Sequence, residues 1–153
     1  MEDYTGAYQA RKNDVFALLT LPSNHKIAIF HLGGIAIECK LKAFLLIYHR
    51  IKNWDEKSRR TKDSMYNQEI NNPNHNLLTA IKHMPDVYKK AKLNRQFMNL
   101  SHYSFLSLEI RFFQKIGFLK PRYHSEPEQL EYDWKMSFDY VDGWLEKNRE
   151  TIL

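Results

Sequence analysis

Three ionisable residues lie close together in the most apolar stretch of the chain, which runs from Ile27 to Ile47. Glu38 and Lys42 are four residues apart, in the order that favours an ion pair along one helix face. His31 precedes Glu38 by seven residues and should project from nearly the same face. Charged groups in apolar surroundings need partners that offset their lost hydration. The pattern therefore favours a paired polar stripe at a helix–helix or subunit contact over a catalytic group.

Metal and thiol chemistry find little support in this stretch. Zinc needs at least three converging His, Cys or carboxylate ligands, and this helix face offers two at most, so we expect no metal and no cofactor. The single cysteine, Cys39, lies among apolar residues in mid-helix, which is typical of an inert core thiol. Gly33 and Gly34 lie inside a helical pattern and so form no phosphate loop. They favour close approach of another helix.

The composition is that of one ordinary globular domain. The chain has 153 residues, of which 43% are hydrophobic and 27% charged, with a formal net charge of +5. A single cysteine cannot form an internal disulfide, and the first residues are too acidic and polar for a secretory signal. The apolar stretch is too short and too charged to span a bilayer. We therefore expect one cytoplasmic domain over residues 1–153, without membrane association.

Apolar periodicity predicts an all-α, up-and-down bundle of about five helices, and no segment shows sustained strand-like alternation. The second helical segment is apolar on several sides, which predicts that it forms the centre of the fold. Residues 51–74 are polar and of mixed charge, which predicts a long surface excursion with room for one short helical turn. Asn74 is a predicted cap for the helix that follows. The helical patterns cover residues 4–19, 25–50, 75–83, 87–98, 103–116 and 125–145.

Charge is unevenly distributed along the chain. Residues 82–122 include nine basic and two acidic residues, whereas residues 123–153 include three basic and eight acidic residues. Mixed charges on helix surfaces favour the interpretation that the acidic last helix lies against the basic middle and largely neutralises it. The alternative is a basic face that binds phosphates.

The segment Ala28–Ala43 combines an alanine-rich apolar face, a glutamate and then Leu-Lys-Ala. It resembles the signature helix of HEPN domains (higher eukaryotes and prokaryotes nucleotide-binding). Three further segments resemble family features in the same order: the polar turn of the first helix, the His-x-Leu opening of the third, and the Arg-Tyr pair before the last. In this chain they are Ala10–Asp14, His75–Leu77 and Arg122-Tyr123. The resemblance covers residues 10–145 and is weakest over the excursion.

What the resemblance implies is an α-helical bundle that forms a homodimer, often beside a small nucleotidyltransferase partner. It also implies binding of a nucleotide or RNA. The candidate ligand-binding residues are Arg122, Tyr123, Glu38, Lys42, His31 and His75.

Many members of this family are metal-independent endoribonucleases that use an arginine followed, after four to six residues, by a histidine. Arg95 and His102 have this spacing, with six residues between them. The arginine would stabilise charge on the phosphodiester, and the histidine would serve as general base or acid. Gln96 stands where the family usually has Asn, Asp or His. The order of the motifs also makes Arg122 the better counterpart of the family arginine, and His124 follows it too closely for the pattern.

These features lead to one favoured function and two alternatives. The favoured one is a HEPN-like accessory module that dimerises and binds a nucleotide, RNA or a partner protein without catalysis of its own. The first alternative is a toxin-type, metal-independent endoribonuclease that uses Arg95 and His102. The second is a purely structural dimerisation domain.

Overall fold

The computed structural model describes residues 3–22, 25–61, 64–93 and 138–152, and most of these residues are helical. No β-strand occurs among the described residues, which confirms the all-α class for this part of the chain. Residues 138–147 are helical, and the predicted helix at 103–116 lies outside the described residues. The remaining described helices are α1 (Tyr4–Leu19), α2 (Lys26–His49), α3 (Leu77–Lys82), α4 (Pro85–Lys92) and the short α8 (Arg149–Ile152).

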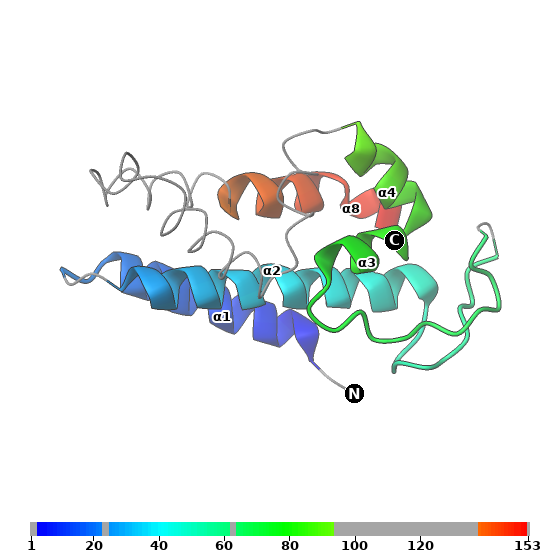
Figure 1. The fold of residues 1–153 in the computed structure, drawn as a ribbon, viewed down its shortest axis with the longest axis horizontal. Helices are drawn as coiled ribbons and strands as arrows, with labels where there is room; N and C mark the ends of the chain where they lie inside the picture. Colours follow the sequence, from blue (N-terminus) through cyan, green and yellow to red (C-terminus); the bar gives the residue numbers. More distant parts are fainter. Residues whose placement is uncertain (1–2, 23–24, 62–63, 94–137, 153) are drawn as a thin grey trace, which may run out of the picture.

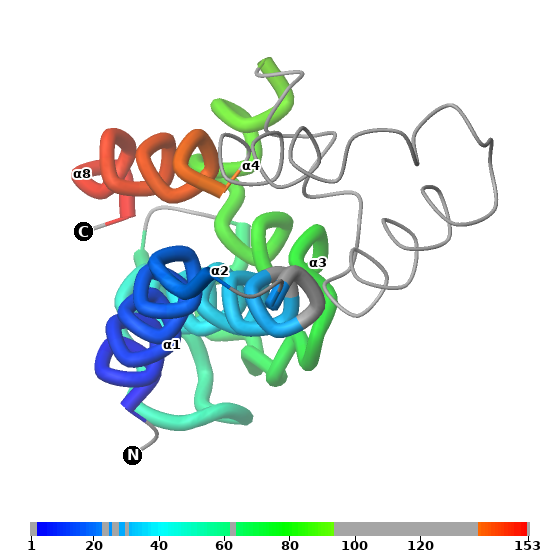
Figure 2. The backbone as a smooth tube through the Cα atoms, turned by 90° about the vertical axis from the view of Figure 1, so that its left-hand side faces the viewer, coloured from blue at the N-terminus to red at the C-terminus, as the bar shows by residue number. Residues whose placement is uncertain are grey.

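Helix α2 is the central element of the described fold, as predicted from the apolar residues on several of its sides. Figure 1 shows α1 lying alongside α2 in the opposite direction, with α3 and the C-terminal helices on the other side of α2. The end-on view in Figure 2 shows the same elements arranged around α2. Every residue from 36 to 45 is buried, so neighbours cover this helix on all sides along that length. No helix of the described residues has both the length and the apolar character required to cross a membrane.

Local capping signals fix the helix ends. The Asp3 side chain accepts a hydrogen bond from the first turn of α1 at 2.7 Å. Helix α2 ends at His49, and the capping residue Arg50 adopts a left-handed conformation with φ of 55°. The cap predicted at Asn74 is wrong, because that residue has φ of 52° in the preceding turn. Asn76 instead has the extended backbone of a cap, and its side chain accepts a hydrogen bond from the Thr79 N–H at 2.9 Å.

The excursion (residues 51–74) doubles back on itself and contains no α-helix in its described residues. The Ser58 N–H donates to the Gln68 carbonyl at 2.8 Å, and the Asn67 N–H donates to the Ser58 carbonyl at 3.0 Å. Ile70 is completely buried and Ser58 is 3% exposed. The excursion is therefore attached to the core through residues that include Ser58 and Ile70, while most of its described side chains face solvent.

Helices α3 and α4 meet at a corner formed by Met84 and Pro85. Proline is favourable at the first position of a helix because its missing N–H would have no partner there, and Pro85 begins α4. Met84, Val87 and Ala91 are completely buried. The lysines of α4 are exposed on the outer side, so this helix has one apolar and one basic face.

Candidate functional site

Glu38, Lys42 and His75 form one cluster. The Lys42 Nζ donates to Glu38 Oε1 at 2.7 Å, and Nδ1 of His75 lies 2.9 Å from Glu38 Oε2. The side chains of Glu38 and Lys42 are each 9% exposed, whereas that of His75 is 60% exposed. Both oxygens of the buried carboxylate are thus engaged, one by a buried ammonium and one by a surface imidazole.

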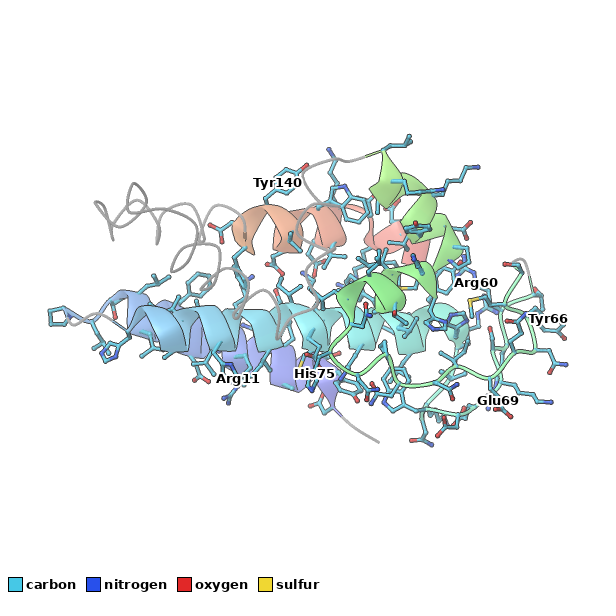
Figure 3. All side chains as sticks on the ribbon, viewed as in Figure 1. Arg11, Arg60, Tyr66, Glu69, His75 and Tyr140 are labelled. Carbon is cyan, nitrogen blue, oxygen red and sulfur yellow. The ribbon has the colours of Figure 1, made fainter. Side chains whose placement is uncertain are left out.

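Three segments of the chain position this cluster. Glu38 and Lys42 occupy successive turns of α2, and His75 directly precedes the residue that caps α3. The bond to Glu38 therefore attaches the start of α3 to the middle of α2, where Figure 3 shows His75. The Lys42 ammonium also lies 5.5 Å from the centroid of the Tyr4 ring on α1, which is a favourable cation–π distance.

His31 does not take part in the cluster. It is exposed on α2, and the partners of both Glu38 oxygens are Lys42 and His75. Seven residues of helix correspond to about 10 Å along the axis, so a shared helix face does not bring His31 to Glu38. His31 and Glu38 are therefore not bonded to each other, and the ligand-binding roles of His31 and His75 stay predictions.

A second charged cluster, absent from the sequence analysis, lies on another side of α2. Lys40 is buried, and its Nζ lies 2.6 Å from Asp142 Oδ1 and 3.1 Å from Glu146 Oε1. Helix α1 contributes Lys12, whose Nζ lies 2.7 Å from Asp142 Oδ2, and Tyr8, whose hydroxyl donates to Asp142 Oδ1 at 2.7 Å. We call these five residues the Asp142 cluster. It joins α1, α2 and the helical residues 138–147.

Hydrogen bonding keeps Asp142 and Lys12 ionised despite their partial burial. Burial alone would raise the pKa of Asp142, but hydrogen bonds from Lys12, Lys40 and Tyr8 hold that pKa below its usual value. Burial would likewise lower the pKa of Lys12, yet the bond to Asp142 raises it. The pKa of the Tyr8 hydroxyl is raised by burial and by its bond to Asp142. The cluster is a compensated ion-pair network with a neutral tyrosine, an arrangement that connects helices.

Arg60 attaches the excursion to the helices. Its Cζ lies 3.7 Å from the centroid of the Tyr48 ring, and its Nη2 lies 2.9 Å from Asp86 Oδ2. The Tyr48 hydroxyl donates to the same Asp86 oxygen at 3.2 Å. A second attachment pairs His49 Nδ1 with Ser58 Oγ at 2.8 Å. The excursion is therefore held to the C-terminal end of α2 and the start of α4.

Four candidates, Arg95, His102, Arg122 and Tyr123, lie outside the described residues. Most of the basic middle of the chain lies outside them as well. Within the described part, the acidic Asp142 and Glu146 pair with lysines of α1 and α2, and Lys90 of α4 donates to the Thr151 hydroxyl. No group of three or more His, Cys, Asp or Glu that could hold a metal ion occurs among the residues described.

Comparison of the chain with protein-family models, with curated proteins and with solved structures gives no match in any of the three. A function is therefore inferred from the residues and their geometry.

Proposed function

We propose that this chain is a HEPN-like module that dimerises and binds RNA or a nucleotide without catalysis of its own. The observation that supports this proposal is the bond between Nδ1 of His75 and Glu38 Oε2, at 2.9 Å. It joins the two segments, Ala28–Ala43 and His75–Leu77, that separately resemble the helices of that family. A chance likeness in two segments 37 residues apart would not require their polar side chains to be bonded to each other.

The geometry of the Glu38 cluster favours positioning over acid–base catalysis. A general base must reach the proton it removes, and the side chain of Glu38 is 9% exposed, with one oxygen bonded to Lys42 and the other to His75. If Glu38 took up a proton, the buried ammonium of Lys42 would lose its counter-charge, which is costly. The cluster therefore holds α3 on α2.

Binding of a polyanion is consistent with the charges on the described surface. The chain carries a formal net charge of +5. Several of the exposed basic side chains lie on two elements, the excursion and the outer face of α4. Basic surfaces attract nucleic acids because contact with phosphates releases condensed counterions. The exposed basic residues of these two elements are Lys52, Lys57, Arg59, Lys89, Lys90 and Lys92.

The test uses the full chain. Light scattering after size-exclusion chromatography measures the oligomeric state. Fluorescence anisotropy with labelled single-stranded RNA and with labelled ATP, at about 50 and 200 mM salt, measures binding. We expect a dimer and an affinity for at least one ligand that weakens with salt. A dimer that binds neither ligand would overturn the binding role and favour a structural dimerisation domain, and a monomer would overturn the dimer.

The spacing of Arg95 and His102 keeps one alternative in the test. If the chain is instead a ribonuclease, the same RNA is cut in the presence of a chelator, and both Arg95→Ala and His102→Ala abolish the cleavage. Intact RNA after prolonged incubation supports the proposed binding module.

A further inference from the structure

The outer side of the excursion carries an open hollow of about 390 Å³. Its walls include two basic residues, Lys57 and Arg59, and one aromatic residue, Tyr66. Figure 3 shows Tyr66 at the outer end of the excursion, well separated from His75. Small-molecule sites are typically about 300–1,000 Å³ in volume, so the hollow is large enough for one nucleotide unit.

We propose that this hollow binds one nucleotide of a single-stranded RNA, with its base stacked on Tyr66 and its phosphate on Arg59 and Lys57. The inference rests on the proposed RNA-binding function and assigns that function a surface. An exposed aromatic face beside basic groups is the arrangement that holds single-stranded nucleic acids, because every base can stack and every nucleotide carries a phosphate.

The exposure of Tyr66 is the first argument for this assignment. The residue is 55% exposed, and it makes no hydrogen bond or ring contact within the described residues. Trp54 of the same excursion, in contrast, is half-buried and donates from Nε1 to the Tyr4 hydroxyl at 2.9 Å. Trp54 therefore has partners within the described chain, whereas Tyr66 is exposed and can contact a bound ligand.

The availability of Arg59 is the second argument. Its side chain is 64% exposed, and its Nη2 lies 3.5 Å from Glu56 Oε2, which makes a weak surface ion pair. Glu56 also accepts bonds from the Lys52 N–H at 3.2 Å and the Asn53 side-chain amide at 3.1 Å. The Glu56 carboxylate keeps these donors when Arg59 turns away, so the guanidinium can reach a phosphate at little cost.

Glu56 also indicates which ligand the hollow accepts. Its carboxylate belongs to the wall that holds Lys57 and Arg59. Two cations beside one anion can compensate the single charge of a phosphodiester but not the several charges of a nucleoside triphosphate. We therefore expect single-stranded RNA to bind at this hollow and ATP to compete poorly.

The hydrogen-bonded arms of the excursion hold the hollow in shape. Ser58 pairs with Gln68 and Asn67 through backbone bonds of 2.8 and 3.0 Å, so Arg59 and Tyr66 lie on facing arms. Arg60, next in sequence, fixes one arm to Tyr48 and Asp86. A site with a fixed framework loses less conformational entropy when its ligand binds.

The test compares matched variants of the full chain by anisotropy, with a labelled single-stranded RNA of about ten nucleotides. We expect Tyr66→Leu to weaken binding by about ten-fold or more and Tyr66→Trp to retain it, since stacking needs an aromatic face. Arg59→Gln should weaken binding several-fold and lower the salt dependence by about one phosphate contact. The control is Arg11→Gln, because Arg11 is also an exposed arginine (41%) in an i, i+3 ion pair, and it should bind like wild type.

The outcomes separate this inference from the function on which it rests. If wild type binds RNA and the Tyr66 and Arg59 variants match Arg11→Gln, the hollow is not the site although the proposed function stands. If wild type binds no RNA at low salt, the inference about the hollow is overturned, and the proposed binding function is overturned with it only when ATP also fails to bind. Photocrosslinking of wild type to thiouridine RNA gives a readout that needs no variant. A crosslink to the peptide containing Tyr66 supports the hollow, and crosslinks confined to other peptides overturn it.

Discussion

The ammonium of Lys40 lies between a buried carboxylate, that of Asp142, and a half-exposed one, that of Glu146. Its side chain is 2% exposed, and its Nζ also lies 4.8 Å from the centroid of the Tyr8 ring. Removing a charged group from water costs several kcal/mol unless partners compensate it. The aspartate, the glutamate and the tyrosine have to come together with Lys40, so the Asp142 cluster links the first and last helices to the central one.

Asp142→Asn should lower the free energy of unfolding by about 3 kcal/mol, because it leaves a buried ammonium without its nearest counter-charge. Urea denaturation measures the change. Glu146→Gln is the matched control, since the Glu146 side chain is 48% exposed, and it should cost less than about 1 kcal/mol. Equal costs for the two variants would contradict this account of the cluster.

Glu38→Gln tests the other cluster. The amide keeps the shape of the side chain but removes the negative charge beside Lys42, whose side chain is 9% exposed. We expect a loss of about 2 kcal/mol in the free energy of unfolding. His75→Asn changes only the exposed partner and should cost less than about 1 kcal/mol. If His75→Asn lowers the free energy of unfolding more than Glu38→Gln does, the bond between His75 and Glu38 contributes more to stability than the Glu38–Lys42 ion pair, which contradicts this account.

At the scale of elements, the excursion is held by a few side chains rather than by its backbone alone. Arg60→Ala removes both the stacking on Tyr48 and the ion pair with Asp86. We expect the free energy of local opening of the excursion to fall by about 1.4 kcal/mol, which is within the range of a desolvated cation–π contact. Hydrogen exchange at the amides of Ser58 and Ile70 should therefore become about ten-fold faster. Arg59→Ala, the exposed neighbour, should leave both amides protected. Unchanged exchange in the Arg60 variant would show that the burial of Ile70 alone anchors the excursion.

At the scale of the whole molecule, two groups of the described residues make stability depend on pH below neutrality, His83 and Asp142. Burial lowers the pKa of His83 from its usual 6.5, so the unfolded chain takes up this proton first. Its contribution to stability is complete above about pH 6.5 and is lost as pH falls through the lowered pKa. The pKa of Asp142 is also lowered, from 3.8. Its ion pairs therefore stabilise the fold fully above about pH 4, and that stabilisation is lost in stronger acid.

We expect the free energy of unfolding, measured by urea denaturation across pH, to fall in two separate windows. His83→Gln should flatten the upper window, and Asp142→Asn should flatten the lower one. A profile in which neither variant alters its window would assign the pH dependence to other groups.

The predictable parts of this molecule are those set by neighbours in sequence. The central position of α2 follows from apolar residues on several sides of the predicted helix, and the Glu38–Lys42 pair follows from a spacing of four residues on one helix. The pairing of Lys40 with Asp142 spans 102 residues, and no local pattern indicates which carboxylate reaches a buried lysine. The sequence did offer one indication of this pairing. Lys40 is a charged residue in an apolar stretch, and its burial requires a partner of opposite charge.

The start of α3 shows a finer limit. Asn74 and Asn76 are equally good caps by residue type, and the choice depends on which of them has an extended backbone. Asn74 accepts a left-handed turn, with its N–H donating to the Asn72 side chain at 2.9 Å, so the helix begins two residues later. The burial of Ile70 could not be predicted from the sequence either. A single apolar residue in a polar segment belongs to no periodic pattern that would indicate its contacts.

Cys39 is the only thiol of the chain and lies on α2 between Glu38 and Lys40, 8% exposed. An alkylating reagent must reach the sulfur before it can react, so modification in native buffer requires that the covering helices move aside first. The rate at which iodoacetamide modifies this sulfur would therefore measure how often the helices that cover α2 move away from it. The native sequence thus carries its own reporter between one residue of each charged cluster, Glu38 and Lys40.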